Sequence, residues 1–423
     1  MSESPINSSS SIAKKRKISE NNAEDSAAPS SSSQSVSSNI LVLDNDCLEI
    51  IFSLLSLKAQ LNFSRSNRKI ECMFRNYAQR KYKHITEDFS YHLEASDLEY
   101  LLEQVNDHVI SFESPIQRFF GDREQLGNDV FEKFFFNLSE NLPCLRKLVL
   151  EAPDYNGEGL HVLEKLQNLE INCELDAKYL TDCCIKMKNL NFLKMGRCTK
   201  NLNSENFSTI VANCRNLETL DFHDNELLDN VAYERVCELS RLKHLIMTCP
   251  RFIEGLHPRP GFIEGLVRRT GTPLESLILY HSNLRKEQIE HICDITSLRE
   301  LWVGSEDDDF SVEGFMKLKS LEYLHLDMEG ITNKHLLELL LGCPRLRVLN
   351  VLYCLDVTSD FISLLNLSSK KLKETNREKI SIYLDESSVD WEENSSFKLD
   401  NIQIINGALW EAPILIEKER NIL

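Results

Sequence analysis

The sequence lacks the cysteine spacing of common metal sites, a hydrophobic run long enough to span a bilayer, and an excess of basic residues. Its 13 cysteines include no C-x-x-C pair, so zinc-finger and RING-type sites are not expected. No apolar run approaches the roughly 20 residues of a transmembrane helix, and the opening MSESPINSSS lacks the charged and then apolar pattern of a signal peptide. We therefore expect a soluble protein in a reducing compartment, with no membrane partner.

Basic residues are outnumbered along the whole chain. The 66 Asp and Glu residues against 48 Lys and Arg residues give a formal net charge of −18, which argues against a nucleic acid as the main partner. Basic or neutral proteins remain as partners.

Catalytic motifs are lacking as well. The sequence has no G-x-S-x-G elbow, no P-loop and no H-E-x-x-H pair. The adjacent thiols of Cys183 and Cys184 fall in a segment of helical character, where buried thiols are usually inert. We therefore expect a protein that is not an enzyme and that uses no metal or cofactor.

Residues 1–38 contain Ser, Asn, Ala and Glu and almost no large apolar side chains, a composition that predicts a disordered tail. The tail includes the basic run Lys14 to Lys17, which is either a nuclear-import patch or solvated charge. We expect a cytoplasmic protein, which also enters the nucleus if the run acts in import.

A repeat is the clearest pattern in the sequence. The motif L-x-x-L-x-L recurs at intervals of 21 to 32 residues, and all but one interval fit the 20 to 29 residues of a leucine-rich repeat. The nine matches begin at Leu145, Leu166, Leu190, Leu217, Leu242, Leu274, Leu298, Leu321 and Leu346. They predict an α/β fold, a leucine-rich-repeat solenoid with a curved parallel sheet and outer helices.

The rest of the chain is expected to border this solenoid. Residues 141–371 form the repeats, and helical segments between them place Cys214 and Cys343 as small apolar spacers in the core. Residues 86–140 are expected to be a linker and a degenerate capping repeat, with a strand that turns Ile110 and Phe112 inward. Residues 372–423 contain two strand-like segments and are expected to form a C-terminal cap.

A short apolar module precedes the repeats at residues 39–85. Its residues Leu48, Ile51, Phe52 and Leu55 have the i, i+3, i+4, i+7 spacing of one helix face, and Asp44 is a plausible N-cap. A second stripe begins after Ser56. A module of this size usually needs a partner to cover its apolar surface.

The module resembles an F-box, since Leu43, Leu48, Ile51, Phe52, Ser53, Leu55, Lys58, Leu61 and Phe63 fall in the F-box spacing. An F-box ahead of leucine-rich repeats is similar to the F-box and leucine-rich-repeat class of substrate receptors of SCF-type ubiquitin ligases. The chain departs from the family pattern at Asp44, where Pro is usual, at Ala59 and Gln60, where Asp-Leu is usual, and at Ser66 and Asn67, where Val-Cys is common.

The resemblance implies that the module docks on the Skp adaptor of a cullin-RING ligase while the repeats hold a protein substrate. Helix-in-groove docking uses anchors with this spacing. The expected adaptor-binding residues are Leu43, Leu48, Ile51, Phe52, Leu55, Leu57, Leu61 and Phe63. In the alternative, the stripe packs against the neighbouring repeats and the chain is a leucine-rich-repeat scaffold without a ligase.

Substrate-binding residues follow from the alternation of side chains along each strand. The third, fifth and seventh positions of the motif should face the concave surface, where apolar and aromatic side chains would mark a binding patch. The residues expected there are Ile246, Ile278, Tyr280, Trp302, Tyr323, His325 and Leu352, with Trp302 as the anchor. The alternative is that the C-terminal tail, with Trp391 and Trp410, folds back and covers this patch.

Overall fold

A computed structural model describes residues 40–90, 93–115, 128–151, 155–196, 201–224, 227–249, 260–305, 311–328, 330–375, 378–394, 401–410 and 414–416. The chain divides into two compact units, Met1–Leu43 and Asp44–Leu423. In the first, the short 3-10 helix η1 (Ile40–Val42) is described. The predicted disordered tail and its basic run lie outside the described residues. Every described residue from Asp44 onward belongs to the second unit.

The second unit begins with three helices, α1 (Asn45–Leu54), α2 (Leu57–Ser64) and α3 (Arg68–Lys81). As predicted, Asp44 caps α1, and its carboxylate accepts a hydrogen bond from the backbone N–H of Cys47 at 2.8 Å. The fully buried ring of Phe52 packs with its centroid 5.3 Å from that of Phe74 and 5.6 Å from that of Tyr77. These rings give the three helices a core of their own.

A buried carboxylate joins this helical module to the next helix. Asp97, in α5 (Ala95–Val105), has a side chain only 4 % exposed and forms ion pairs with Lys58 and, at 2.5 Å, with Arg65. Burial opposes the charge on Asp97, but the hydrogen bonds from the two cations outweigh it and hold the pKa of the carboxyl below its usual range. The pairs therefore fix the module against α5.

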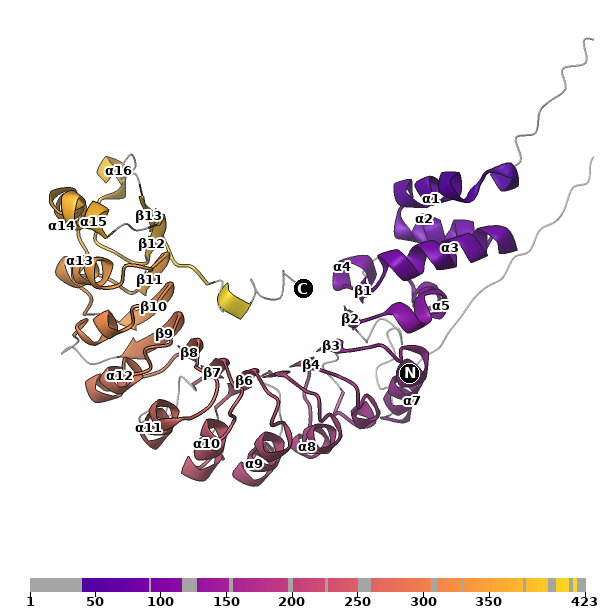
Figure 1. Cartoon of the computed structure of the whole chain (residues 1–423), viewed down its shortest axis with the longest axis horizontal. Helices are drawn as coiled ribbons and strands as arrows, with labels where there is room; N and C mark the ends of the chain where they lie inside the picture. The colour runs from indigo at the N-terminus through magenta and orange to yellow at the C-terminus, as the bar shows by residue number, and fades with distance from the viewer. Residues whose placement is uncertain are drawn as a thin grey trace, which may run out of the picture. The chain divides into compact units, whose positions relative to one another are not determined.

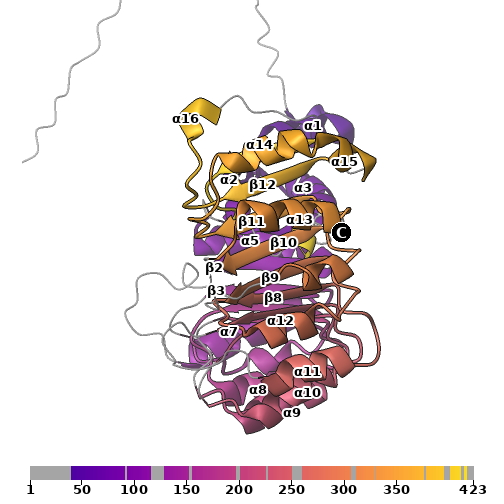
Figure 2. The same ribbon diagram turned by 90° about the vertical axis from the view of Figure 1, so that its left-hand side faces the viewer.

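Thirteen strands form one sheet in which every strand pairs in parallel with its neighbours in chain order. They are β1 (His84–Ile85), β2 (Ser111–Pro115), β3 (Lys147–Glu151), β4 (Asn168–Asn172), β5 (Phe192–Met195), β6 (Thr219–His223), β7 (His244–Thr248), β8 (Ser276–Tyr280), β9 (Glu300–Ser305), β10 (Tyr323–Met328), β11 (Val348–Leu352), β12 (Ile380–Leu384) and β13 (Ile402–Asn406). Figure 2 shows the strands stacked one above another.

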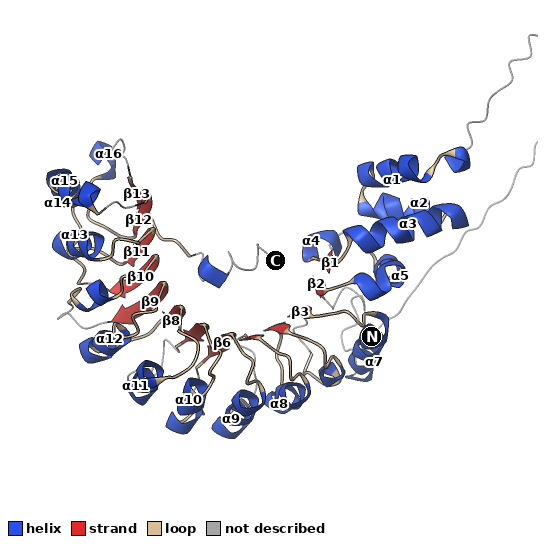
Figure 3. Ribbon diagram, viewed as in Figure 1, coloured by secondary structure: helices blue, strands red, loops and turns tan. Residues whose placement is uncertain are grey.

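Helices alternate with these strands along the chain, and most of them, from α5 onward, lie on the outer, convex side of the sheet (Figures 1 and 3). The helices that alternate with the strands are α4 (Glu87–Ser90), α5, α7 (Asn128–Asn141), α8 (Ala177–Lys186), α9 (Ser204–Asn213), α10 (Asn230–Cys237), α11 (Pro260–Arg268), α12 (Lys286–Ile292), α13 (Asn333–Gly342), α14 (Asp360–Leu367), α15 (Ser369–Glu374) and α16 (Trp391–Asn394), with the 3-10 helices η2 (Asn106–His108), η3 (Leu160–Val162) and η4 (Gly314–Lys317). The predicted leucine-rich-repeat solenoid is confirmed.

The motif leucines fill the space between the sheet and the helices. In the repeat that begins at Leu217, this leucine, Leu220 and Phe222 are all fully buried. Each such side chain contributes about 1.5–3 kcal/mol relative to an exposed one. Cys214 and Cys343 are also buried at the ends of their helices, where the expected spacer role places them.

The sheet extends beyond the nine motifs at both ends. Before them, β2 buries Phe112 as expected, but Ile110 lies just outside the strand and is 39 % exposed, so only one of the two side chains predicted to turn inward does so. After them, the two predicted C-terminal strands are present as β12 and β13. The domain limits drawn at residues 85, 140 and 371 stay predictions.

Candidate protein-binding surfaces

The residues predicted to bind an adaptor do not share one face of the helical module. Leu48, Phe52 and Leu61 are fully buried in its core and cannot serve as exposed anchors, which corrects the prediction. The others are half-buried: Leu43, in the first unit, and Ile51, Leu55, Leu57 and Phe63. The sequence pattern had identified the inner stripe of α1, because an inner and an outer stripe have the same helical spacing.

A second apolar stripe of α1 faces solvent. Ile50 is 59 % exposed and Leu54 is 80 % exposed, and Cys47 lies exposed one turn before Ile50. The three positions are spaced i, i+3, i+7, as helix-in-groove anchors are. We call Cys47, Ile50 and Leu54 the outer stripe. A helix apolar on two faces was the signal in the sequence that could have identified it.

Gln60, one of the departures from the F-box pattern, has a structural role here. Its side chain is 2 % exposed, and its Nε2 donates hydrogen bonds to the carbonyl oxygens of Phe52 at 2.7 Å and Leu55 at 2.9 Å. Its Oε1 accepts one from the Tyr82 hydroxyl at 2.7 Å. The amide thus ties the end of α1 to the residue that follows α3, and a polar group is buried here because it is satisfied.

The strand register arranges the concave side chains in rows. The central row, at the fifth position of each motif, changes from charged to apolar side chains between β6 and β7, where Asp221 pairs with Ile246. Its members, in strand order from β4 to β12, are Glu170, Lys194, Asp221, Ile246, Ile278, Trp302, His325, Asn350 and Tyr383. The first three are charged, and Lys194 forms an ion pair with Glu170 at 2.5 Å. From β7 to β9 the row is apolar.

The residues predicted to bind a substrate lie on this face, but they do not face solvent. Six of them, Ile246, Ile278, Trp302, Tyr323, His325 and Leu352, are at most 3 % exposed, and Tyr280 is half-buried. The expectation of an open patch is therefore wrong. Ile246, Ile278, Trp302 and Leu352 instead form one cluster with Phe192 and Ile416, and Ala408 packs against it.

The cover is the C-terminal segment that follows β13, which runs to the inner side of the sheet (Figure 1). The backbone of Leu409 is held twice by Asn350, whose Nδ2 donates to its carbonyl at 3.0 Å and whose Oδ1 accepts from its N–H at 2.9 Å. Further on, the N–H groups of Ile414 and Leu415 donate to the carboxylate of Glu300 at 2.6 and 3.2 Å. We call residues 407–410 and 414–416 the strap.

Of the two tryptophans expected in such a cover, one is there. The Trp410 ring lies 6.4 Å from that of Trp302, centroid to centroid, whereas Trp391 belongs to α16. Both anchors of the strap are buried polar side chains, since Glu300 and Asn350 are fully inaccessible. A buried carboxylate and a buried amide need such partners, and the strap's backbone supplies them.

A neutral histidine lies beneath the strap. The imidazole of His325 is fully buried, stacks on Trp302 at 4.5 Å, and has its Nδ1 3.2 Å from Asn350 Nδ2. Burial lowers the pKa of His325 to about 3. Because Asn350 Nδ2 can only donate, Nδ1 accepts and the ring proton is on Nε2, which has no hydrogen-bond partner in the described part of the chain.

The described residues also bear on metal, membrane and thiol chemistry. No group of three or more His, Cys, Asp or Glu side chains is placed among them to hold a metal ion. None of the described helices has the length and apolar composition needed to cross a bilayer. Burial raises the pKa of the Cys183 thiol well above its usual value, and that of Cys184 is also raised, largely by its hydrogen bond with Cys214. Raised values keep both thiols protonated.

Comparison with known proteins identifies similar solved structures. No family model and no curated protein matches the sequence. Among solved structures, the chain is similar to one in the crystal structure of the Rad7 and Elc1 complex in yeast, with a TM-score of 0.48 and 14 % identity over 85 % of this chain and 92 % of that one. It is also similar to a leucine-rich-repeat protein of Leptospira interrogans, with a TM-score of 0.32 and 15 % identity over 72 % of this chain and 91 % of that one. The function therefore has to follow from this chain's own residues.

Proposed function

We propose that this protein is a substrate receptor of an SCF-type ubiquitin ligase. In this role the α1–α3 module docks on the Skp adaptor, which links it to a cullin-RING ligase, and the repeats bind the protein to be ubiquitinated. The chain carries out no chemistry itself, and its contribution to the rate is proximity and orientation of the substrate. It acts in the cytoplasm or the nucleus, where thiols stay reduced.

The outer stripe of α1 carries this proposal. Exposure of large apolar side chains such as Ile50 and Leu54 to water is unfavourable, and burying them against a partner would stabilise the complex. The module's own core cannot take them in, because Leu48, Phe52 and Leu61 already fill it. A stripe with helix-in-groove spacing is suited to a partner's apolar groove. The F-box resemblance of the same segment supports the Skp adaptor as that partner.

The side of the chain that meets the substrate is the concave face. Most of its apolar row lies under the strap, but Tyr353 is 38 % exposed and Trp410 is 59 % exposed. Exposed aromatic side chains next to a buried cluster are typical of interaction hot spots. We place the substrate contact there, beside the strap.

Substitution of one outer-stripe residue tests the adaptor role. Leu54→Asp is expected to reduce capture of the Skp adaptor from cells about 30-fold or more, because it would bury an unpaired carboxylate in an apolar interface. The residue is 80 % exposed, so the melting temperature should not change.

Leu367→Asp is the matched control, since Leu367 is 83 % exposed at the end of α14, away from the module. It should leave adaptor capture intact. If natively purified wild-type protein brings down neither the adaptor nor a cullin, the ligase role is refuted and a repeat scaffold without a ligase remains. If Leu54→Asp binds as well as wild type, the outer stripe is not the docking face.

A further inference from the structure

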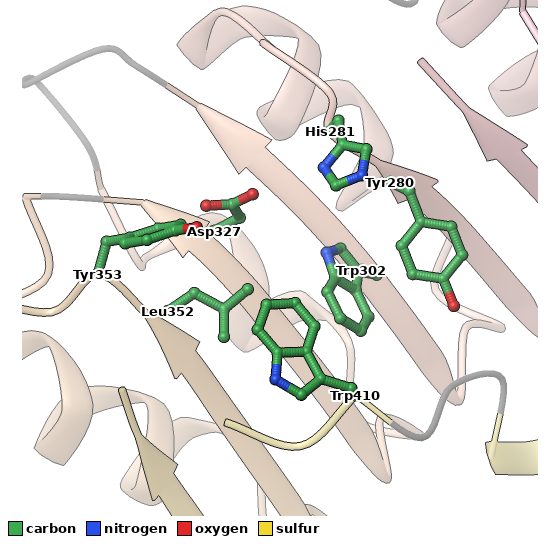
Figure 4. Close-up of a pocket in the computed structure, with 7 residues that line it drawn as sticks. All are labelled: Tyr280, His281, Trp302, Asp327, Leu352, Tyr353 and Trp410. Atoms are coloured by element: carbon green, nitrogen blue, oxygen red, sulfur yellow. The ribbon is translucent and has the colours of Figure 1, made fainter. Parts of the chain in front are cut away.

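A pocket of about 280 Å³ opens on the concave face at the ends of strands β8 to β11. Figure 4 shows that its walls come from separate elements: Tyr280 ends β8, Trp302 lies in β9, and Trp410 belongs to the strap. The rings of Tyr280 and Trp302 meet edge to face at 4.8 Å. With Tyr353, four aromatic rings line one small space.

Two pocket residues adopt an unusual backbone conformation. His281 and Tyr353 both have a φ of +54°, in the left-handed region that non-glycine residues seldom adopt and that is costly for a bulky side chain. Each directly follows a strand residue that also lines the pocket, Tyr280 and Leu352 respectively. Adjacent residues of an extended strand point to opposite faces, so the turn at positive φ is what brings both members of each pair to the same pocket.

Two titratable polar side chains line the pocket with the aromatic rings, the carboxylate of Asp327 in β10 and the imidazole of His281. In Figure 4 the carboxylate lies with Tyr353 on the side of the two indoles away from Tyr280. Aromatic faces attract cations because the ring quadrupole places negative potential above the ring. A carboxylate beside them adds to the same attraction.

The surroundings also favour a cation. Neither Lys nor Arg lines the pocket. Behind Trp302, His325 remains uncharged because burial lowers its pKa to about 3. The whole chain has a formal net charge of −18, which raises the local concentration of cations. A strongly hydrated ammonium would lose more water than these rings can replace, whereas an N-methylated ammonium is weakly hydrated and presents methyl groups to the rings.

From this geometry we infer that the pocket binds the methylated ammonium of an N-methyl-lysine side chain carried by a protein ligand. This inference rests on the proposed function only in that a protein ligand meets the concave face. It does not require the adaptor. The methylated ammonium head meets the exposed rings of Trp410 and Tyr353 above the buried Trp302, and Asp327 balances its charge.

Binding of defined probes to the full-length chain, without adaptor, tests the pocket. The probes are a short peptide with trimethyl-lysine, the same peptide with unmodified lysine, the same peptide with a neutral tert-butyl isostere of trimethyl-lysine, and choline. Since two of the three tryptophans line the pocket, tryptophan fluorescence reports binding directly. The trimethyl-lysine peptide is expected to bind about five-fold or more tighter than the neutral isostere, the range of one cation–π contact.

Substitutions of single residues test whether the peptide binds in this pocket. Trp410→Ala and Asp327→Asn should each weaken the trimethyl-lysine peptide about five-fold or more, and both residues are at least partly exposed, so the fold should persist. Trp391→Ala is the matched control, because Trp391 lies in α16 outside the pocket, and it should bind like wild type.

Several results would overturn the inference. Equal binding of the neutral isostere would make the pocket merely apolar, and equal binding of unmodified lysine would remove the preference for methylation. Choline binding without peptide binding would make it a small-molecule site. Absence of all binding would reject the pocket as a cation site. Because the outer stripe takes no part in this assay, these results are independent of adaptor capture by Leu54→Asp.

Discussion

Removal of the Asn350 side chain should release the strap. In Asn350→Ala, the strap loses the two hydrogen bonds that join the side chain to the backbone of Leu409, at 3.0 and 2.9 Å. A hydrogen bond of this kind contributes about 1 kcal/mol net, so docking of the strap should weaken by about 2 kcal/mol. That loss corresponds to roughly a 30-fold rise in the population of the released strap.

Amide hydrogen exchange measures this population. The Leu409 amide loses its own acceptor in the variant, so it is not an independent probe. The amides of Ile414 and Leu415 are better, because Glu300 holds them and not Asn350. If the strap docks as one unit, both should exchange about 30-fold faster in Asn350→Ala, the factor that corresponds to a loss of about 2 kcal/mol. Amides of β6 should not change.

The reasoning fails if Ile414 and Leu415 keep their protection while Leu409 loses it, since the two anchors would then act independently. It also fails if β6 exchanges faster by the same factor, because the whole repeat array would have been destabilised. Asn216→Ala is the matched control. It also removes two asparagine side-chain hydrogen bonds, from Asn216 Nδ2 to the carbonyl of Lys188 at 2.9 Å and from the Arg241 guanidinium to Asn216 Oδ1 at 3.0 Å, on an exposed surface.

Two further predictions concern buried polar groups. Gln60→Leu removes three hydrogen bonds and should destabilise the α1–α3 module by about 2–3 kcal/mol in urea unfolding; unchanged unfolding would mean that the amide does not hold the module together. In the folded protein the pKa of His325 is about 3, below the value near 6.5 in the unfolded chain. The neutral imidazole therefore contributes fully to folding stability above about pH 6.5, and this contribution is lost as the pH falls toward 3. Between pH 7 and 5, wild type should lose about 2 kcal/mol more stability than His325→Phe, since each pKa unit is worth about 1.4 kcal/mol; equal losses in chemical denaturation would contradict a buried neutral imidazole.

The repeats could be predicted from the sequence because their signal is periodic and local. Each motif places Leu at the first and fourth positions and a large apolar residue at the sixth, and burial of Leu217, Leu220 and Phe222 shows how directly this pattern becomes a core. The N-cap at Asp44 is local in the same sense, since a carboxylate three residues before the N–H of Cys47 is enough to form it.

The docking face of α1 could not be decided in this way. Its two apolar stripes, Leu48 with Phe52 and Ile50 with Leu54, have the same spacing, and only the positions of Phe74 and Tyr77 in α3 decide which one lies inside. Spacing identifies a helix as amphipathic, but the neighbouring helix determines which stripe remains for a partner.

The concave face shows the same limit over a longer distance. Asn350 bonds to Leu409 of the strap and to His325, which stacks on Trp302, although the strap comes more than a hundred residues after Trp302. Glu300 and Asn350 are buried on the concave side of their strands, where they pair in register with Ser276 and His325, respectively. A carboxylate and an amide at such positions need hydrogen-bond partners, and an extended backbone that crosses the sheet offers N–H and C=O groups to both. A carboxylate or an amide that is buried on the concave face therefore indicates a segment that covers it, and the aromatic pocket lies where that cover ends.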